Sequence, residues 1–226
     1  MTCNVRIEQY NPRLDLKTFN EPVIFKNAIN DWKALDEWNT LKKFCDRYSH
    51  HSIYSKRASF SYNYNTIDTK LTEYCKHSHK EHIIVMDDNK KTANEDIFLS
   101  KIANDFYIPK LFDSITHTRI LSFGGGFRGV DFMQHCSAWI GMISGRKLWQ
   151  FADPKFKYID TSCDNQSNDH RIKKCIVNKT DVVYVPDMWW HATCNLDPYT
   201  IAIGTQCQGK QKNGWSYSSN MFHNEL

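Results

Sequence analysis

The sequence predicts an α+β protein, mostly β, whose C-terminal half closes into a small barrel. Helical patterns are confined to roughly the first half of the 226-residue chain, and evenly spaced short strands fill the second half. Glycine and proline turns separate those strands. We expect a single domain over residues 1–226, with a mixed helix and strand part over about 1–115 and a barrel core over about 116–210.

The N-terminal part contains both kinds of element. A proline opens a short strand over residues 22–25, and Thr40 is placed to cap a helix whose apolar residues recur at helical spacing. Alternation of polar and aromatic residues predicts a half-exposed strand over residues 59–64. Asn94 is placed to cap a second helix, which Pro109 ends.

From residue 119 onward the pattern is that of short strands. Gly124–Gly126 and Asp153-Pro154 mark turns between them, and no helix follows the three glycines, so they do not form a phosphate-binding loop. The predicted strands are 120–123, 138–143, 148–151, 174–177, 181–185 and 200–205.

Composition excludes several classes of protein. Aromatic residues make up 14% of the chain, which excludes a disordered one. The net charge of +4 comes from 29 basic and 25 acidic residues scattered along the chain, and this is no nucleic-acid signature. The sequence has no run of 18 apolar residues and its first residues lack a signal-peptide core. We therefore expect no membrane segment and an intracellular location, cytoplasmic or nuclear; the oligomeric state is left open.

The eight cysteines form no CxxC pair, and in an intracellular chain we expect them to be reduced thiols, several of them buried. One segment of eight residues gathers four metal-binding side chains, Cys75, His77, His79 and His82. Its lysine and glutamate neighbours favour a solvated segment over a structural metal site. The N-glycosylation pattern occurs at 165–167 and 178–180, and it carries no weight in a chain without a secretory signal.

Two segments that lie far apart in the sequence carry a histidine each. His135 ends a β-type run that begins at Gly129, and His191 follows a β-type run that begins at Asp181. We expect the two rings to face each other inside the barrel, with ring nitrogens about 3 Å apart if they share one metal ion.

The first of these segments also carries a carboxylate. Residues two apart on a strand point the same way, so we expect Asp131, Met133 and His135 on one face. Non-haem iron oxygenases hold their metal with two imidazoles and one carboxylate on one face of the ion. Lys147, on the next strand, is placed to pair with a dicarboxylate.

These segments resemble the jumonji-C and cupin-like 2-oxoglutarate oxygenases, and small proteins with little beyond a jumonji-C domain are the most similar type. The resemblance covers roughly residues 20–207. The matching motifs are Gly145–Trp149 with Asp153-Pro154 for "G-x-K-x-W … P", Asp181–Pro186 with Trp189–His191 and Asn195–Asp197 for "G-D-x-x-x-x-P-x-x-W-W-H … N-L-D", and Pro22–Ile24 with Trp32 and Trp38 for the N-terminal opening.

The resemblance implies a double-stranded β-helix, a jelly roll of the cupin type, with N-terminal helices packed on it. It implies Fe(II) and 2-oxoglutarate as cofactors. His135 and His191 fall on metal-ligand positions of the family, and Lys147 and Asn195 fall on cofactor-binding positions.

The chain departs from the family at the first ligand position, where Met133 replaces a histidine. A thioether is a weak ligand for Fe(II). Asp131 could supply the missing ligand only if a bulge brought its oxygens to the metal, because regular strand geometry places it about 7 Å away along the strand. We expect a weak two-histidine site rather than a rebuilt triad.

The implied activity is that of an Fe(II)/2-oxoglutarate-dependent oxygenase that hydroxylates or demethylates a polypeptide side chain. The implied partner is a protein or peptide substrate, and no catalytic residue beyond the metal ligands is predicted. Two alternatives stay open: a catalytically degenerate interaction module, and an altered metal site in which the Met133 sulfur favours copper.

Overall fold

The computed structural model describes residues 3–57, 66–78, 82–86, 96–115, 118–156, 163 and 169–207. Over those ranges the strands are β1 (Arg6–Gln9), β2 (Val23–Lys26), β3 (Ser52–Arg57), β4 (Thr66–Lys70), β5 (His82–Met86), β6 (Thr118–Gly124), β7 (Gly129–Met133), β8 (Ala138–Ser144), β9 (Lys147–Ala152), β10 (Lys173–Val177), β11 (Val182–Val185), β12 (Trp190–Asn195) and β13 (Thr200–Gln206). The helices are α1 (Ala34–Glu37), α2 (Leu41–Tyr48), α3 (Leu71–Glu73), which continues into a π-helical turn at Tyr74–Ser78, and α4 (Asp96–Lys101), with short 3-10 turns at Leu16–Thr18, Ala103–Asp105 and Lys110–Phe112.

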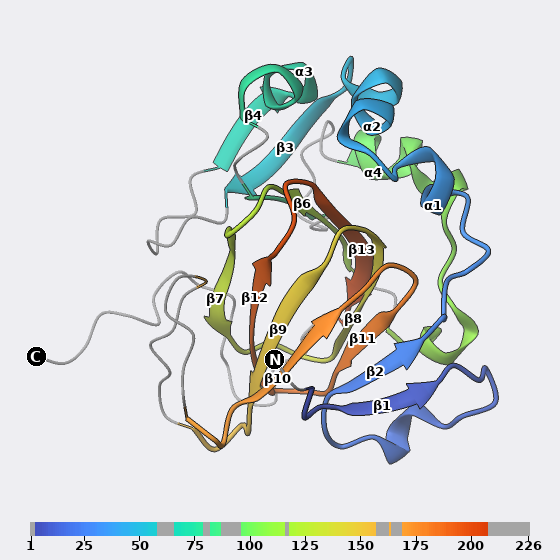
Figure 1. The fold of residues 1–226 in the computed structure, drawn as a ribbon. Helices are drawn as coiled ribbons and strands as arrows, with labels where there is room; N and C mark the ends of the chain where they lie inside the picture. Colours follow the sequence, from blue (N-terminus) through green and yellow to red (C-terminus); the bar gives the residue numbers. More distant parts are fainter. Residues whose placement is uncertain are drawn as a thin grey trace, which may run out of the picture.

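The strands form two sheets (Figure 1). The larger sheet has the order β1-β2-β11-β8-β13-β6-β5-β3-β4, and the smaller one has the order β10-β9-β12-β7. From β6 to β13 the chain passes repeatedly from one sheet to the other, as in a double-stranded β-helix. The predicted fold class, mostly β with a jelly-roll barrel, is confirmed.

The interior of the barrel is lined from both sheets. Met142 and Val183 of the larger sheet pack in one buried cluster with Trp149 and Phe151 of the smaller sheet. Because side chains alternate along a strand, residues in register with Trp149 and Phe151 also face this interior.

A second and larger apolar cluster covers the other face of the larger sheet. It joins Trp32, Trp38 and Phe44 of the N-terminal region to Phe123 and Trp139 of the barrel strands. In Figure 1 the helices gather on this side of the sheet, as predicted. The helices therefore pack on the outer face of the larger sheet, and the inner face lines the interior of the barrel.

Several predicted elements are confirmed at their ends. Thr40 caps α2, where its Oγ1 accepts a hydrogen bond of 3.2 Å from the backbone N–H of Lys43. The six predicted C-terminal strands correspond to β6, β8, β9, β10, β11 and β13. The predicted strand at 59–64 and the cap at Asn94 lie outside the described residues.

The expectation of reduced cysteines is wrong. All eight are paired, as Cys3–Cys175, Cys45–Cys75, Cys136–Cys207 and Cys163–Cys194. Their Cα–Cα distances of 4.4 to 5.9 Å lie in the range of disulfides. The partners lie 30 to 172 residues apart, so sequence spacing did not show the pairs. Cys75 is thereby removed from the candidate metal cluster around it.

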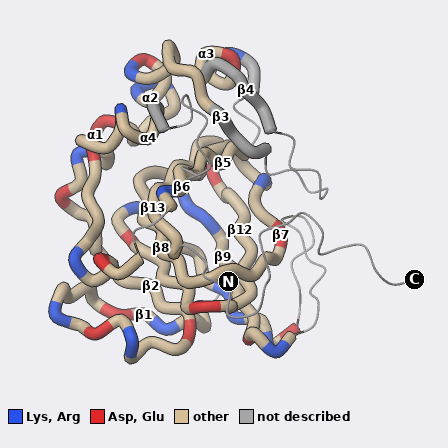
Figure 2. The backbone as a smooth tube through the Cα atoms, turned by 180° about the vertical axis from the view of Figure 1, so that it is seen from behind, with Lys and Arg blue, Asp and Glu red and all other residues tan. Residues whose placement is uncertain are grey.

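Charged residues of both signs are interspersed along the described chain (Figure 2). Among the helices of the described residues, none is both long enough and apolar enough to cross a membrane.

Candidate functional site

Strand β12 brings the polar residues of the site onto the inner face of the barrel. His191, Thr193 and Asn195 alternate along it and are buried. The adjacent strand β9 places Phe151 opposite His191 and Lys147 opposite Asn195. The two ends of this row are separated by about 13 Å along the strand, so the structure brings Lys147 and Asn195 together at the end away from His191.

His135 reaches the other end of the row from the segment that follows β7. Its Nε2 lies 2.9 Å from Nε2 of His191. The two rings are nearly perpendicular, with centroids 4.4 Å apart, and both are buried. The predicted separation of about 3 Å between the ring nitrogens is confirmed.

Backbone carbonyl groups fix the protonation of both rings. Nδ1 of His135 donates to the carbonyl oxygen of Cys136 at 2.6 Å, and Nδ1 of His191 donates to that of Trp189 at 2.9 Å. Because a carbonyl oxygen can only accept, each neutral ring carries its proton on Nδ1 and presents a lone pair at Nε2. Metal-binding histidines show the same arrangement.

Two lone pairs that face each other repel unless a cation lies between them. Burial, with the nearby His135 as a second cause, lowers the pKa of His191 to about 3, and burial also lowers the pKa of His135. A shared proton is therefore disfavoured near neutral pH. The donor set fits a metal ion held by two imidazoles.

Met133 lies beside this pair. It is in register with His191 across β7 and β12, so its side chain lies on the same, inner face. This is where a third imidazole of the family would stand.

The register between β7 and β12 shifts between Met133 and Val130, which pairs with Thr193. Three steps along β7 oppose two steps along β12, so β7 contains a bulge. The expectation that Asp131, Met133 and His135 share one regular strand face is therefore wrong, because the bulge interrupts the alternation and β7 ends at Met133.

The bulge is of the kind that would be needed to bring Asp131 to the metal position. Even so, the described residues contain no group of three or more His, Cys, Asp or Glu side chains that could hold one metal ion. Asp131 therefore does not join His135 and His191 in this structure. What the barrel presents is a pair of histidines with a methionine in register beside them.

At the other end of the row, Lys147 is fully buried beside neutral groups. Its Nζ donates to Oγ of Ser122 at 2.8 Å, and this hydroxyl lies 2.7 Å from Nε2 of His82. None of the ion pairs found among the described residues includes Lys147. Burial lowers the pKa of its ammonium to about 7.

Two further polar atoms near Lys147 are buried without a hydrogen-bond partner among the described residues. They are Oγ1 of Thr193 and Oδ1 of Asn195. A buried cation without a counter-ion fits an anionic ligand, and the Thr193 hydroxyl could donate to an oxygen atom of that ligand. The amide oxygen of Asn195 can only accept, so it does not contribute to anion binding.

His82 and Ser122 were not predicted as part of the site. Their only signals in the sequence were weak: Ser122 is the one polar residue within an apolar strand, and His82 lies in the cysteine and histidine segment discussed above. The structure instead places His82 inside the barrel, on β5.

Comparisons with known proteins found relatives with a jumonji-C domain. No protein-family model matches the chain. It is 25% identical over 212 residues to JmjC domain-containing protein 8 of Mus musculus, covering 83% of this chain and 75% of that protein. It is 21% identical over 253 residues to lysine-specific demethylase JMJ21 of Arabidopsis thaliana, covering 94% of this chain and 25% of that protein. The chain is related to the jumonji-C proteins.

Solved structures show the same fold. The chain matches the X-ray structure of E. coli ycfD with a TM-score of 0.56 and 12% identity over 91% of this chain. It matches the structure of Escherichia coli ribosomal oxygenase YcfD with a TM-score of 0.55 and 13% identity over 90% of this chain. It spans about half of those longer chains, 56% and 54%. The resemblance to the jumonji-C family predicted from the motifs is confirmed.

The disulfide Cys136–Cys207 should support the metal site, because Cys136 follows His135 and its carbonyl group accepts a hydrogen bond from the His135 ring. Replacing both cysteines by serine should lower the affinity of the histidine pair for Co(II) or Zn(II) about tenfold. Losses of this size occur when a group that orients a metal-binding histidine is removed. The matched control replaces Cys45 and Cys75, which join α2 to the π-helical turn. Competition titration against a chelator measures both variants, and equal affinities would contradict a supporting role for Cys136–Cys207.

His82 should make folding stability depend on pH. Burial, with the Lys147 charge as a second cause, lowers the pKa of His82 from 6.5 to about 3. Between those values the unfolded chain binds a proton here that the folded chain does not, so stability falls as the pH is lowered through this window. His82→Gln should reduce the pH dependence of the unfolding free energy by about 1.4 kcal/mol per pH unit.

Urea unfolding in the presence of a chelator, at several pH values across that window, tests this expectation. His170→Gln is the control, because His170 is exposed. If the two variants keep the same pH dependence as the parent chain, His82 does not titrate as described.

Proposed function

We propose that this chain is an oxygenase of the jumonji-C type that depends on Fe(II) and 2-oxoglutarate and oxidises a polypeptide side chain, by hydroxylation or demethylation. The observation that carries the proposal is the fully buried Lys147 ammonium without a carboxylate partner among the described residues. It lies on the same inner face as the His135 and His191 pair. A dicarboxylate could bind a metal on the histidine pair with one end and the Lys147 ammonium with the other.

Each residue then has a defined role. His135 and His191 would hold the metal through Nε2. Lys147, oriented by Ser122, would neutralise the distal carboxylate. Asn195 would line the same end of the barrel interior, with its amide nitrogen donating to the carbonyl oxygen of Gly125 at 3.4 Å. Bound there, the metal and the 2-oxo acid would supply the activation of dioxygen.

The apolar neighbours of the site exclude water from it. Trp149 stacks on His191, with ring centroids 6.2 Å apart, and Phe151 stacks on Trp149 at 5.6 Å. Both side chains are buried. Such a dry surrounding strengthens the attraction between Lys147 and a carboxylate.

The names of the relatives support a polypeptide as the substrate class. One relative is called a lysine-specific demethylase, and one structural neighbour is called a ribosomal oxygenase. Both names describe enzymes, which favours an enzymatic role over a purely structural one.

The alternative, a degenerate interaction module, is favoured by one observation. No third His, Cys, Asp or Glu joins the histidine pair among the described residues, and the ligand position holds Met133. A thioether beside two imidazoles also suits a softer metal such as copper better than it suits Fe(II).

One experiment separates these possibilities. The purified chain is analysed for bound metal and then given Fe(II) and 2-oxoglutarate, and conversion to succinate is measured. Bound iron with turnover supports the oxygenase. A folded protein that binds no metal and forms no succinate supports the interaction module, and tight copper binding without turnover supports the altered site. His191→Ala should abolish metal binding, and His170→Ala, at an exposed position, is its control.

A further inference from the structure

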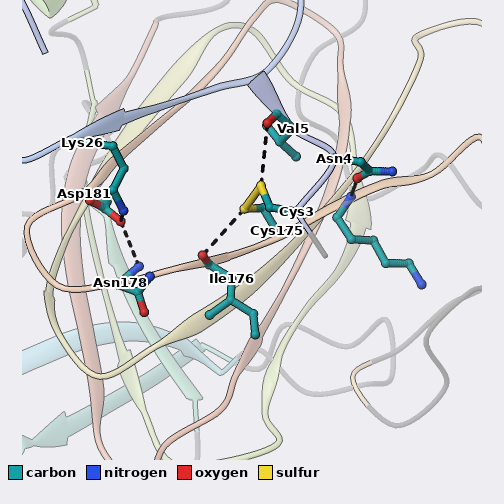
Figure 3. Close-up of a disulfide and its surroundings, with 9 residues drawn as sticks. Cys3, Asn4, Val5, Lys26, Cys175, Ile176, Asn178 and Asp181 are labelled. Carbon is teal, nitrogen blue, oxygen red and sulfur yellow. Dashed lines mark hydrogen bonds and ion pairs between the residues drawn. A yellow bond between two sulfur atoms is a disulfide. The ribbon is translucent and has the colours of Figure 1, made fainter. Parts of the chain in front are cut away.

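The four disulfides join segments from the N-terminal region, the helices and the barrel strands. Cys3–Cys175 joins the segment before β1 to β10 (Figure 3), and Cys45–Cys75 joins α2 to the π-helical turn. Cys136–Cys207 joins the two segments that follow β7 and β13, and Cys163–Cys194 joins a loop residue to β12. No cysteine of the chain is left free.

Pairing on this scale depends on the surroundings in which the chain folds. Reducing compartments keep protein thiols reduced, and a chain with all eight cysteines in disulfides is typical of an oxidising one. The alternative use of clustered thiols, a structural metal, finds no group of ligands among the described residues. The pairs join residues far apart in sequence, so they are a property of the fold.

In an oxidising compartment of the secretory route, an N-glycosylation acceptor pattern can be modified. Asn178-Lys179-Thr180 matches the acceptor pattern for N-linked glycans, and it forms the turn between β10 and β11. Asn178 and Lys179 are exposed. Figure 3 shows Asn178 beside Asp181, in the surroundings of Cys3–Cys175.

The turn is well defined in the fold. The backbone N–H of Asn178 donates to a carboxylate oxygen of Asp181 at 3.3 Å, and Lys26 forms an ion pair with the same carboxylate at 2.5 Å. These contacts use the backbone of Asn178 and leave its exposed side chain outside the core. A bulky glycan at this position displaces no packed residue.

We infer that the chain matures in an oxidising compartment of the secretory route and carries an N-linked glycan on Asn178. The inference rests on the disulfides and the exposed turn and is independent of the proposed function. It replaces the cytoplasmic or nuclear location expected from the sequence.

The chemistry requires two co-reactants of such a compartment. Each disulfide forms when two thiols lose two protons and two electrons to the disulfide of an oxidoreductase, which is reduced to a dithiol. For the glycan, the amide nitrogen of Asn178 loses a proton and bonds to the anomeric carbon of a lipid-linked oligosaccharide, and the lipid diphosphate leaves.

The glycan is tested on the full chain produced in eukaryotic cells. Endoglycosidase treatment should increase the electrophoretic mobility of the parent chain, and Asn178→Gln should lose one such step. Thr180→Ala should lose the same step although Asn178 is intact, and Thr180→Ser should keep it. Asn165→Gln, in the second acceptor pattern, should leave the Asn178 step unchanged. A parent chain whose mobility does not respond, or an Asn178→Gln chain that responds like the parent, overturns the glycan assignment.

The compartment is tested by counting thiols. Cells that make the chain are lysed in acid, and the denatured protein is alkylated before and after reduction and weighed by mass spectrometry. We expect none of the eight cysteines to react before reduction and all eight to react after it. Eight alkylated cysteines without reduction would overturn the oxidising compartment.

Discussion

Met133→His should raise the affinity of the site for Fe(II) about a hundredfold or more. The new imidazole would stand in register with His191, on the inner face of the barrel, and would add a third nitrogen ligand to the pair. Loss of a single group that hydrogen-bonds to a metal ligand lowers metal affinity 10- to 100-fold, so an added ligand should raise the affinity at least as much. Anaerobic competition titration measures the affinity, and conversion of 2-oxoglutarate to succinate should rise with it.

Two further variants show whether a gain in affinity comes from the Met133 position and whether Asp131 binds the metal. Met188→His is the matched control, because Met188 is an exposed methionine in the turn before β12. Asp131→Asn should change metal binding little, since Asp131 does not join the histidine pair. If Asp131→Asn abolishes metal binding and Met133→His gives no gain, Asp131 completes a rebuilt triad and the two-histidine site is wrong.

Lys147→Ala should raise the 2-oxoglutarate concentration needed for turnover about a hundredfold to a thousandfold. Removing one partner of a buried ion pair costs about 3 to 5 kcal/mol, because the other charge is left buried and unpaired. The dependence of succinate formation on 2-oxoglutarate measures the effect. Lys179→Ala, at an exposed position of the turn after β10, is the control. An unchanged requirement in the Lys147 variant would rule out this role.

Lys147 should lower the stability of the ligand-free protein, because its ammonium group is buried. The pKa of Lys147 is lowered by burial from 10.5 to about 7, so between those values the unfolded chain binds more protons than the folded chain. At pH 7 the buried ammonium is therefore destabilising, by a few kcal/mol according to the size of the shift. Lys147→Met should raise the unfolding free energy in urea while it abolishes the response to 2-oxoglutarate.

The histidine pair and Lys147 could be predicted because the motifs around them are specific. The strands that carry the histidines were less predictable, because His191 lies on β12, which was not predicted, and His135 follows the end of β7. The ring nitrogens of His135 and His191 lie 2.9 Å apart, in agreement with the expected separation of about 3 Å. The place of Asp131 could not be predicted, because no local pattern marks the bulge in β7.

Other features depend on contacts that the sequence does not encode locally. Ser122 and His82 come from neighbouring strands, β6 and β5, and meet Lys147 of β9 only in the folded barrel. Strands β1, β3, β4, β5 and β12 were not predicted, because their short and partly polar sequences gain order from pairing with neighbouring strands. The disulfides were missed because their partners meet only after folding.

The disulfides can form only in a certain order during synthesis, because each one has to wait until its second cysteine has been translated. Cys45–Cys75 joins consecutive cysteines and can close early, but Cys3 has to wait for a partner 172 residues later. At ordinary rates of translation that wait lasts roughly 10 to 35 s. Cys45 emerges long before Cys175, so a premature bond of Cys3 to a nearer thiol has time to form. Reaching the native pairs then requires thiol–disulfide exchange, and the yield of correctly folded chain should depend on a disulfide isomerase.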